Sequence, residues 1–125
     1  MSTTYPVLLH LCPGAAWAAA QSVGQHRPGS LAEVGFVHLS TPEQVHLPAN
    51  RLYAGRTDLL LLHIDPALLQ APVRWEPGVV TDPASMMFPH LYGPLPVAAV
   101  VAVSEYRPGP DGLFHPVQSR DSPAT

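Results

Sequence analysis

Proline limits what this chain can fold into more than any other residue, because it occupies 16 of the 125 positions. Each proline fixes its own φ angle and has no N–H to donate, so it interrupts the interior of helices and strands. The sequence therefore predicts short elements joined by many fixed turns. At this length we expect one domain with a hydrophobic core of its own.

Several apolar stretches predict β-strands. Tyr5–Leu11 and Val97–Val103 have the composition of a first and a last strand. Asp58–Ile64 contains four consecutive leucines, which indicates a strand that is covered on both faces. Val73–Glu76 predicts a short strand whose two charged residues, Arg74 and Glu76, share one face.

The clearest helix runs from Pro13 through an alanine-rich segment to Val23, and Gly24 can close it in a left-handed cap. We expect Trp17 to anchor this helix to the sheet. The polar stretch Gln25–Glu33 contains a Pro-Gly turn signal and predicts a loop. Asp65 followed by Pro66 predicts the start of a short helix that ends at Gln70.

The central stretch is Gly35–Gln44, which has the pattern of a strand that runs into a helix start. Thr41 is an expected N-cap, and Gln44 lies three residues later, as in a capping box. Pro48 predicts a kink or two short helices. His38, Ser40 and Thr41 then form either a polar site beside the donor-rich helix N-terminus or a core histidine beside an ordinary cap.

After Pro77 the sequence loses its periodicity. Residues 77–89 predict a long loop, and residues 88–96 predict a rigid loop that carries His90 and Tyr92. We expect one globular domain over residues 1–106. Residues 107–125 form a tail rich in Pro, Gly and Ser that is docked in part, through Phe114 and Val117.

Composition excludes several classes of protein. The net charge is -3, charged residues make up 12% and lysine is absent, so no basic surface for DNA is expected. No apolar run approaches a membrane span and no signal peptide is visible, so a cytoplasmic protein is predicted. A single cysteine, Cys12, excludes an internal disulfide. It lies before a helix start, where thiolates are favoured, although apolar packing is its other role.

The motifs of common catalytic sites are missing. The sequence has no zinc-binding spacing, no GxSxG elbow and no glycine-rich phosphate loop, and no metal is predicted. What remains is a set of polar residues from separate segments, which would line one cleft for a small polar ligand if the strands converge. These residues are His10, His38, Ser40, Thr41, Glu76, His90 and Tyr92.

Six blocks of sequence resemble the bacterial "domain of unknown function 952" family. They are LLHL (8–11) with Trp17, GFVHLST (35–41), ANRLYAG (49–55), DLLLLHIDPALL (58–69), RWE (74–76) and FPHLYGPLPVAAVVAV (88–103). That family is similar in fold to the ADP-ribosyltransferases. The resemblance implies a compact α+β domain of two small, mostly antiparallel sheets with short flanking helices, holding NAD between them.

The resemblance also implies roles. His10 would contact the NAD ribose, Ser40 or Thr41 would lie by the nicotinamide, and Glu76 or His90 would orient the attacking group. Two features depart from the transferases, since Leu-Cys follows His10 and no ExE or QxE pair is present.

Two hypotheses follow. The first is a transferase or hydrolase that uses NAD, as a substrate, or another nucleotide. Its catalytic residues would be His38, His90 and Glu76. Its substrate-binding residues would be His10, Ser40, Thr41, Asn50, Arg51, Tyr53 and Tyr92. The second is a module that binds a small metabolite without catalysis.

Overall fold

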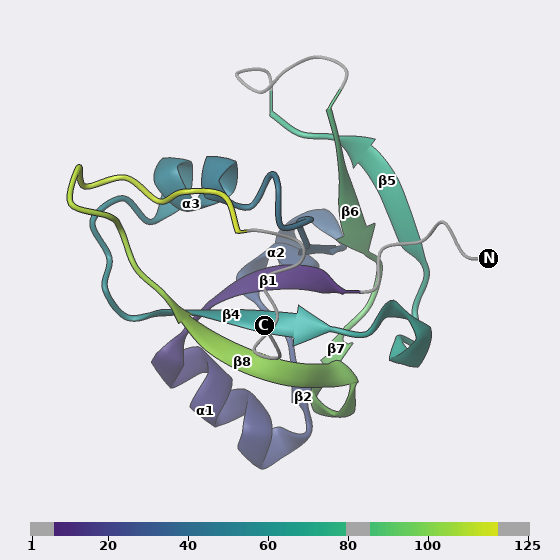
Figure 1. Cartoon of the computed structure of the whole chain (residues 1–125). Coiled ribbons are helices and arrows are strands. Elements are labelled where there is room, and N and C mark those ends of the chain that lie inside the picture. Colours follow the sequence, from purple (N-terminus) through teal and green to yellow (C-terminus); the bar gives the residue numbers. More distant parts are fainter. Residues whose placement is uncertain (1–6, 80–85, 118–125) are drawn as a thin grey trace.

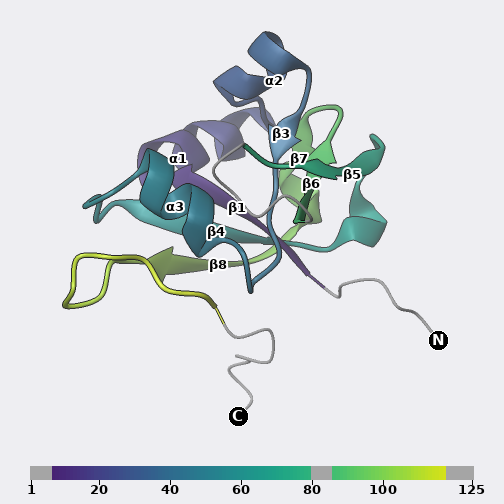
Figure 2. The ribbon, with the colours of Figure 1, turned by 90° about the horizontal axis from the view of Figure 1, so that it is seen from above.

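The computed structural model describes residues 7–79 and 86–117 (Figures 1 and 2). Its helices are α1 (Gly14–Val23), α2 (Gly29–Val34) and α3 (His46–Leu52), with 3-10 turns η1 (Pro66–Leu68) and η2 (Val97–Ala99). Its strands are β1 (Leu8–Pro13), β2 (Gln25–His26), β3 (Val37–His38), β4 (Leu59–Ile64), β5 (Val73–Pro77), β6 (Met87–Leu91), β7 (Leu95–Pro96) and β8 (Val100–Tyr106).

Every strand pairing among the described residues is antiparallel. The first sheet has the order β1-β4-β8 and the second the order β3-β6-β5, while β2 and β7 form a separate two-stranded ribbon. The prediction of a small α+β domain is thus confirmed, with one sheet more than expected. Within the described ranges, one isolated bridge, between Leu9 and Ser40, connects the edge of the first sheet to the chain that follows β3.

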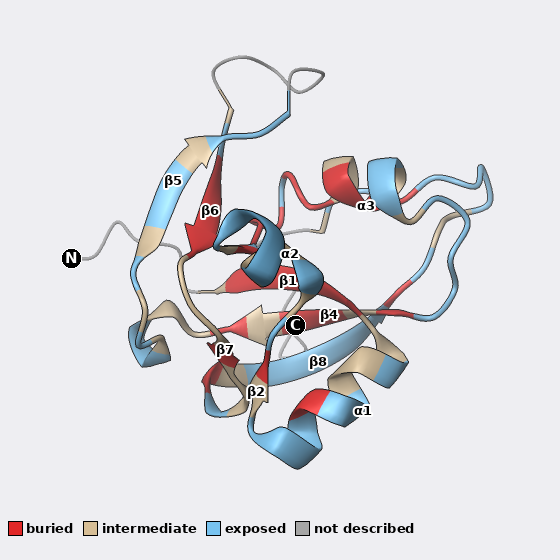
Figure 3. Cartoon of the chain, turned by 180° about the vertical axis from the view of Figure 1, so that it is seen from behind, coloured by how far each residue is buried: buried red, intermediate tan, exposed pale blue. Residues whose placement is uncertain are grey.

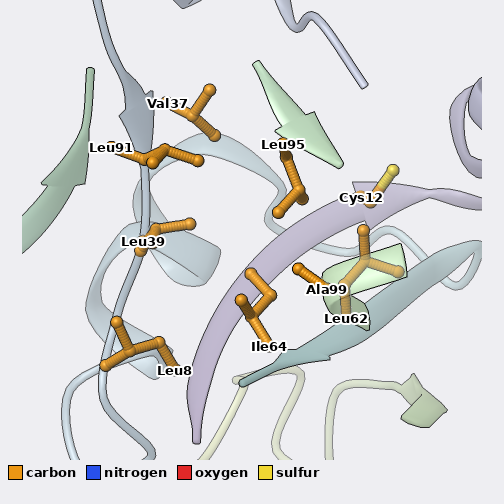
Figure 4. Close-up of a cluster of buried hydrophobic side chains, with 9 residues drawn as sticks. All are labelled: Leu8, Cys12, Val37, Leu39, Leu62, Ile64, Leu91, Leu95 and Ala99. Carbon is orange, nitrogen blue, oxygen red and sulfur yellow. The ribbon is translucent and has the colours of Figure 1, made fainter. Parts of the chain in front are cut away.

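The leucine-rich strand β4 lies in the middle of the first sheet, as its sequence predicts. Its side chains alternate between two cores, which explains why both faces are apolar. Leu62 and Ile64 point into the core between the two larger sheets, where Val37 and Leu91 meet them (Figure 4). Trp17 of α1 packs against the same core, as expected.

The second core lies on the opposite face of the first sheet. Leu9, Leu59 and Leu61 pack there against Val45, which precedes α3, and Ala49, which lies within it. The segment after β8 crosses this region and buries Phe114, which is only 2% exposed (Figure 1). The edge strand β8 is exposed along most of its length, in contrast to β1 and β4 (Figure 3).

Helix α1 confirms its prediction closely, because it ends at Val23 and Gly24 adopts φ 99°. The stretch after it was predicted wrongly as a loop. It contains β2 and the short helix α2, which Gly35 closes in the left-handed region. These two elements are too short to produce a visible hydrophobic period.

The helix start predicted at Pro42 is wrong. Gln44 does accept a hydrogen bond from the Thr41 backbone N–H at 3.0 Å, as half of a capping box would. Its side-chain nitrogen, however, donates to the Met87 carbonyl at 3.1 Å. The pair therefore closes a turn, and α3 begins four residues later as one helix with Pro48 in its first turn, where proline is tolerated.

Boundaries of two further elements differ from expectation. His90 lies on strand β6 and not in a rigid loop, although Pro89 precedes it. The last strand starts at Val100, because η2 occupies the residues before it. Asp65 caps η1 as predicted, accepting from the Ala67 N–H at 3.0 Å. Residues 5 and 6 of the predicted first strand, and residues 80–85 of the predicted long loop, lie outside the described residues.

Candidate functional site

The outer face of the sheet β3-β6-β5 gathers the polar residues that the sequence singled out. His38 pairs with His90 across β3 and β6, and Arg74 pairs with His90 across β5 and β6. Residues directly opposite each other in an antiparallel sheet share a face. Glu76 lies two residues after Arg74 and shares that face too, whereas Val37 and Leu91 point into the core.

Glu76 is the centre of this face. Its Oε1 atom accepts a hydrogen bond from the Tyr92 hydroxyl at 2.7 Å and pairs with Nδ1 of His90, also at 2.7 Å. The bonds from Tyr92 and then His90 lower the pKa of the Glu76 carboxyl below its ordinary value. In return, the carboxylate raises the pKa of the Tyr92 hydroxyl. The pair therefore consists of an ionised Glu76 and a protonated Tyr92 at neutral pH.

Aromatic rings enclose His90. Phe36 stacks on its imidazole with 4.0 Å between ring centroids and 13° between ring planes. His38 meets the same imidazole edge-on at 5.5 Å, and Phe36 also approaches Tyr92 at 5.2 Å. His90 is only 5% exposed, while His38 is exposed. We call these five residues, Phe36, His38, Glu76, His90 and Tyr92, the surface cluster.

Positive charges border the surface cluster. The Arg74 guanidinium lies over the Tyr92 ring, 4.8 Å from its centroid. The pKa of His38 is lowered by desolvation, then by the neighbouring His90 and by the charge of Arg51. His38 is therefore mainly neutral at pH 7. The cluster combines a neutral imidazole, a carboxylate, aromatic rings and two nearby arginines, which suits a polar ligand of mixed charge.

His10 lies one layer deeper. Its Nδ1 atom is 2.8 Å from the backbone carbonyl of His38, and its ring is 5.2 Å from that of His26. Burial lowers the pKa of His10 to about 4, so it is neutral. Beside this pair, Cys12 lies 3.8 Å from Nε2 of His26 and is fully buried. Burial raises the pKa of the Cys12 thiol to about 11, so it packs as an apolar group and not as a thiolate.

The other predicted ligand residues lie away from the surface cluster. Ser40 and Thr41 are each 5% exposed, in the bridge to β1 and the following turn. The Asn50 amide donates to the Phe114 carbonyl at 3.0 Å and accepts from its N–H at 2.8 Å, so it holds the C-terminal segment. Tyr53 packs against the second core, with the Arg56 guanidinium over its ring.

Two residues of the site were missed by the sequence analysis. Phe36 was included only as part of the stretch Gly35–Gln44, and Arg74 was predicted only to share a strand face with Glu76. Neither residue carries a local signal of its own. The only available hint was the period of two, which places Phe36 with His38 and Arg74 with Glu76.

Within residues 7–79 and 86–117, no three His, Cys, Asp or Glu side chains are placed to hold a metal ion. The same ranges contain no helix with the length and apolarity needed to cross a bilayer.

The chain as a whole can be compared with known proteins. A crystal structure of protein CC0527 from Caulobacter crescentus is similar to 87% of this chain and 93% of that one, with 28% identity and a TM-score of 0.75. The solution NMR structure of the same protein gives 28% identity, a TM-score of 0.71 and coverage of 87% and 91%. No curated protein matches the chain. Residues 11–103 match the family model described as a protein of unknown function (DUF952), and the chain belongs to that family.

Proposed function

We propose that this protein binds a nucleotide-class small molecule, NAD or ADP-ribose, at the surface cluster, and that it carries out ADP-ribosyl transfer or hydrolysis there. The observation that carries the proposal is the hydrogen-bonded group of Glu76, His90 and Tyr92 beside the exposed His38. Acid–base groups that are held in fixed positions at a surface are typical of catalytic sites.

The charges of the cluster match the two ends of such a ligand. The Glu76 carboxylate and the faces of aromatic rings attract a cationic centre, such as a nicotinamide ring or a ribosyl carbon with oxocarbenium character. Arg51 and Arg74 border the same face and would attract phosphate groups. Two antiparallel sheets packed through a shared core also agree with the ADP-ribosyltransferase-like fold that the proposal includes.

A second candidate is a metabolite-binding module without catalysis. It is favoured by the burial of His10, Ser40 and Thr41, which the resemblance places at the ribose and the nicotinamide. A ligand that depended on those side chains would have to displace packed structure. Release of nicotinamide from bound NAD distinguishes the two candidates, since only the transferase or hydrolase produces it.

The test is a ligand-induced shift in melting temperature with NAD, ADP-ribose, nicotinamide, AMP and glutathione. A ligand at 100 times its Kd stabilises the folded state by about 2.7 kcal/mol, which corresponds to several degrees for a domain of this size. We expect a shift with NAD or ADP-ribose that His38→Ala abolishes, because His38 is the exposed histidine of the surface cluster. His63→Ala is the matched control, because His63 pairs with Ser104 in the other sheet. No shift with any nucleotide would overturn the proposal.

A further inference from the structure

The hydrogen bonds of Glu76 fix the tautomer of His90. An ionised carboxylate accepts hydrogen bonds and cannot donate them. Because Oε1 of Glu76 lies 2.7 Å from Nδ1 of His90, the proton of the neutral imidazole must be on Nδ1. Nε2 then carries a lone pair, and it is the atom of His90 that can accept a proton.

The surroundings of His90 leave this lone pair open. Phe36 stacks on the imidazole and fixes the ring plane. Among the described residues, Nε2 of His90 has no hydrogen-bond partner. The fully buried side-chain nitrogen that lacks a partner in these ranges is Nδ1 of His46, not Nε2 of His90. Nε2 is therefore not completely buried, although the residue as a whole is only 5% exposed.

We infer that His90 is the general base of this site through Nε2, that its target is a neutral O–H group of water or an alcohol, and that Tyr92 and Glu76 are positioning residues. This assignment rests on the proposed function and extends it. It names the kind of acceptor and the atom that takes the proton, which neither the family description nor the similar structures give.

The step balances without any further reactant. As the acceptor oxygen bonds to C1′ of the ribosyl group, its O–H bond breaks and Nε2 of His90 takes the proton. The C1′–N bond breaks at the same time, and its electron pair leaves with nicotinamide as a neutral molecule. The imidazolium that forms is stabilised by the ionised Glu76 at Nδ1, as a carboxylate does in other His-based sites.

The charges that face His90 from neighbouring strands are compatible with this role. Glu76 on β5 stabilises the imidazolium, while Arg74 lies opposite His90 on the same strand pair. His38 on β3 stays neutral at pH 7 because its pKa is lowered. Tyr92 donates to the same Oε1 atom of Glu76 that faces His90, and this second hydrogen bond restricts rotation of the carboxylate. Tyr92 acts on His90 only through Glu76.

The first experiment reads the tautomer directly from the ¹⁵N chemical shifts of the imidazoles at pH 7.5, with His90→Gln used to assign the signals. We expect the Nδ1–H form for His90 in the unchanged protein. Tyr92→Phe should decrease the population of that form, because Glu76 loses one of its two fixed donors. His63→Gln should leave the His90 signals unchanged. An Nε2–H tautomer in the unchanged protein would overturn the assignment.

The second experiment separates binding from turnover by measuring nicotinamide release from NAD. His90→Gln should lower the rate by about 10²- to 10⁴-fold, the usual contribution of a general base, with NAD affinity changed little. Binding without any release by the unchanged protein would overturn both the base and the catalytic half of the proposed function. Release accompanied by an Nε2–H tautomer would overturn the base assignment alone.

Discussion

A single carboxylate oxygen organises the candidate site at the scale of the residue. Oε1 of Glu76 pairs with the imidazole of His90 on β6 and with the hydroxyl of Tyr92 in the turn after β6. Phe36, from a third segment, stacks on the imidazole and fixes its plane. Side chains that are held by such mutual contacts lose little further freedom when a ligand binds. The site is therefore already ordered in the unliganded protein.

One residue of the predicted ligand set has a structural role instead, which gives a prediction about stability. Replacement of Asn50 by alanine leaves both backbone groups of Phe114 without their partners. Loss of partners for such groups costs about 1–3 kcal/mol. We expect Asn50→Ala to lower the free energy of unfolding by about this amount in urea titrations. Ser22→Ala, which removes an exposed hydrogen bond, is the control. Equal stability of the two variants would contradict the role of Asn50.

At the scale of the element, the short helix α2 ends at a position that only glycine occupies without strain. Gly35 has φ 89° and is followed directly by Phe36. A side chain in the left-handed region costs about 1–2 kcal/mol. Gly35→Ala should therefore lower the melting temperature, whereas Gly29→Ala at the other end of α2 should not, since its φ is ordinary and its Cβ would have space. Equal melting temperatures for these two variants would show that α2 tolerates the strain.

The elements divide clearly into those the sequence could predict and those it could not. Helix α1 and strand β4 carry their own signals, a run of alanines closed by glycine and a run of leucines, and both form as predicted. The strand that carries His90 was misjudged because Pro89 within it and Pro94 and Pro96 after it indicated turns. Glu76 and His90 are 14 residues apart, so their contact depends on the register of β5 and β6, which no local pattern specifies.

For the molecule as a whole, the two larger sheets create an outer and an inner set of histidines. The outer set is the pair His38 and His90, and the inner set is His10 and His26 between the elements of the core. The His38 backbone connects the two sets, because its carbonyl is the partner of His10 Nδ1. Ionisation of His10 would therefore act directly on β3, the strand that carries His38.

This arrangement predicts how the stability of the whole protein depends on pH. The pKa of His10 is about 4 in the folded protein and about 6.5 in the unfolded chain. Between these values the unfolded chain binds more protons, so the stability present above pH 6.5 is lost progressively as the pH falls toward 4. A difference of this size corresponds to about 3 kcal/mol at most. Burial also lowers the pKa of His26, so His26 adds to the same loss of stability as the pH falls.

Urea titrations between pH 7 and pH 5 test this dependence, in a range where the carboxyl groups of Glu76 and Asp58 contribute little because their pKa values are lowered. We expect the free energy of unfolding to decrease throughout this range. The decrease should be smaller in His10→Asn, whose amide can still donate to the His38 carbonyl but does not titrate. His63→Asn should reduce the decrease less than His10→Asn does, because burial also lowers the pKa of His63 but this residue is more exposed than His10. An identical pH dependence for His10→Asn and the unchanged protein would exclude His10 as the main cause.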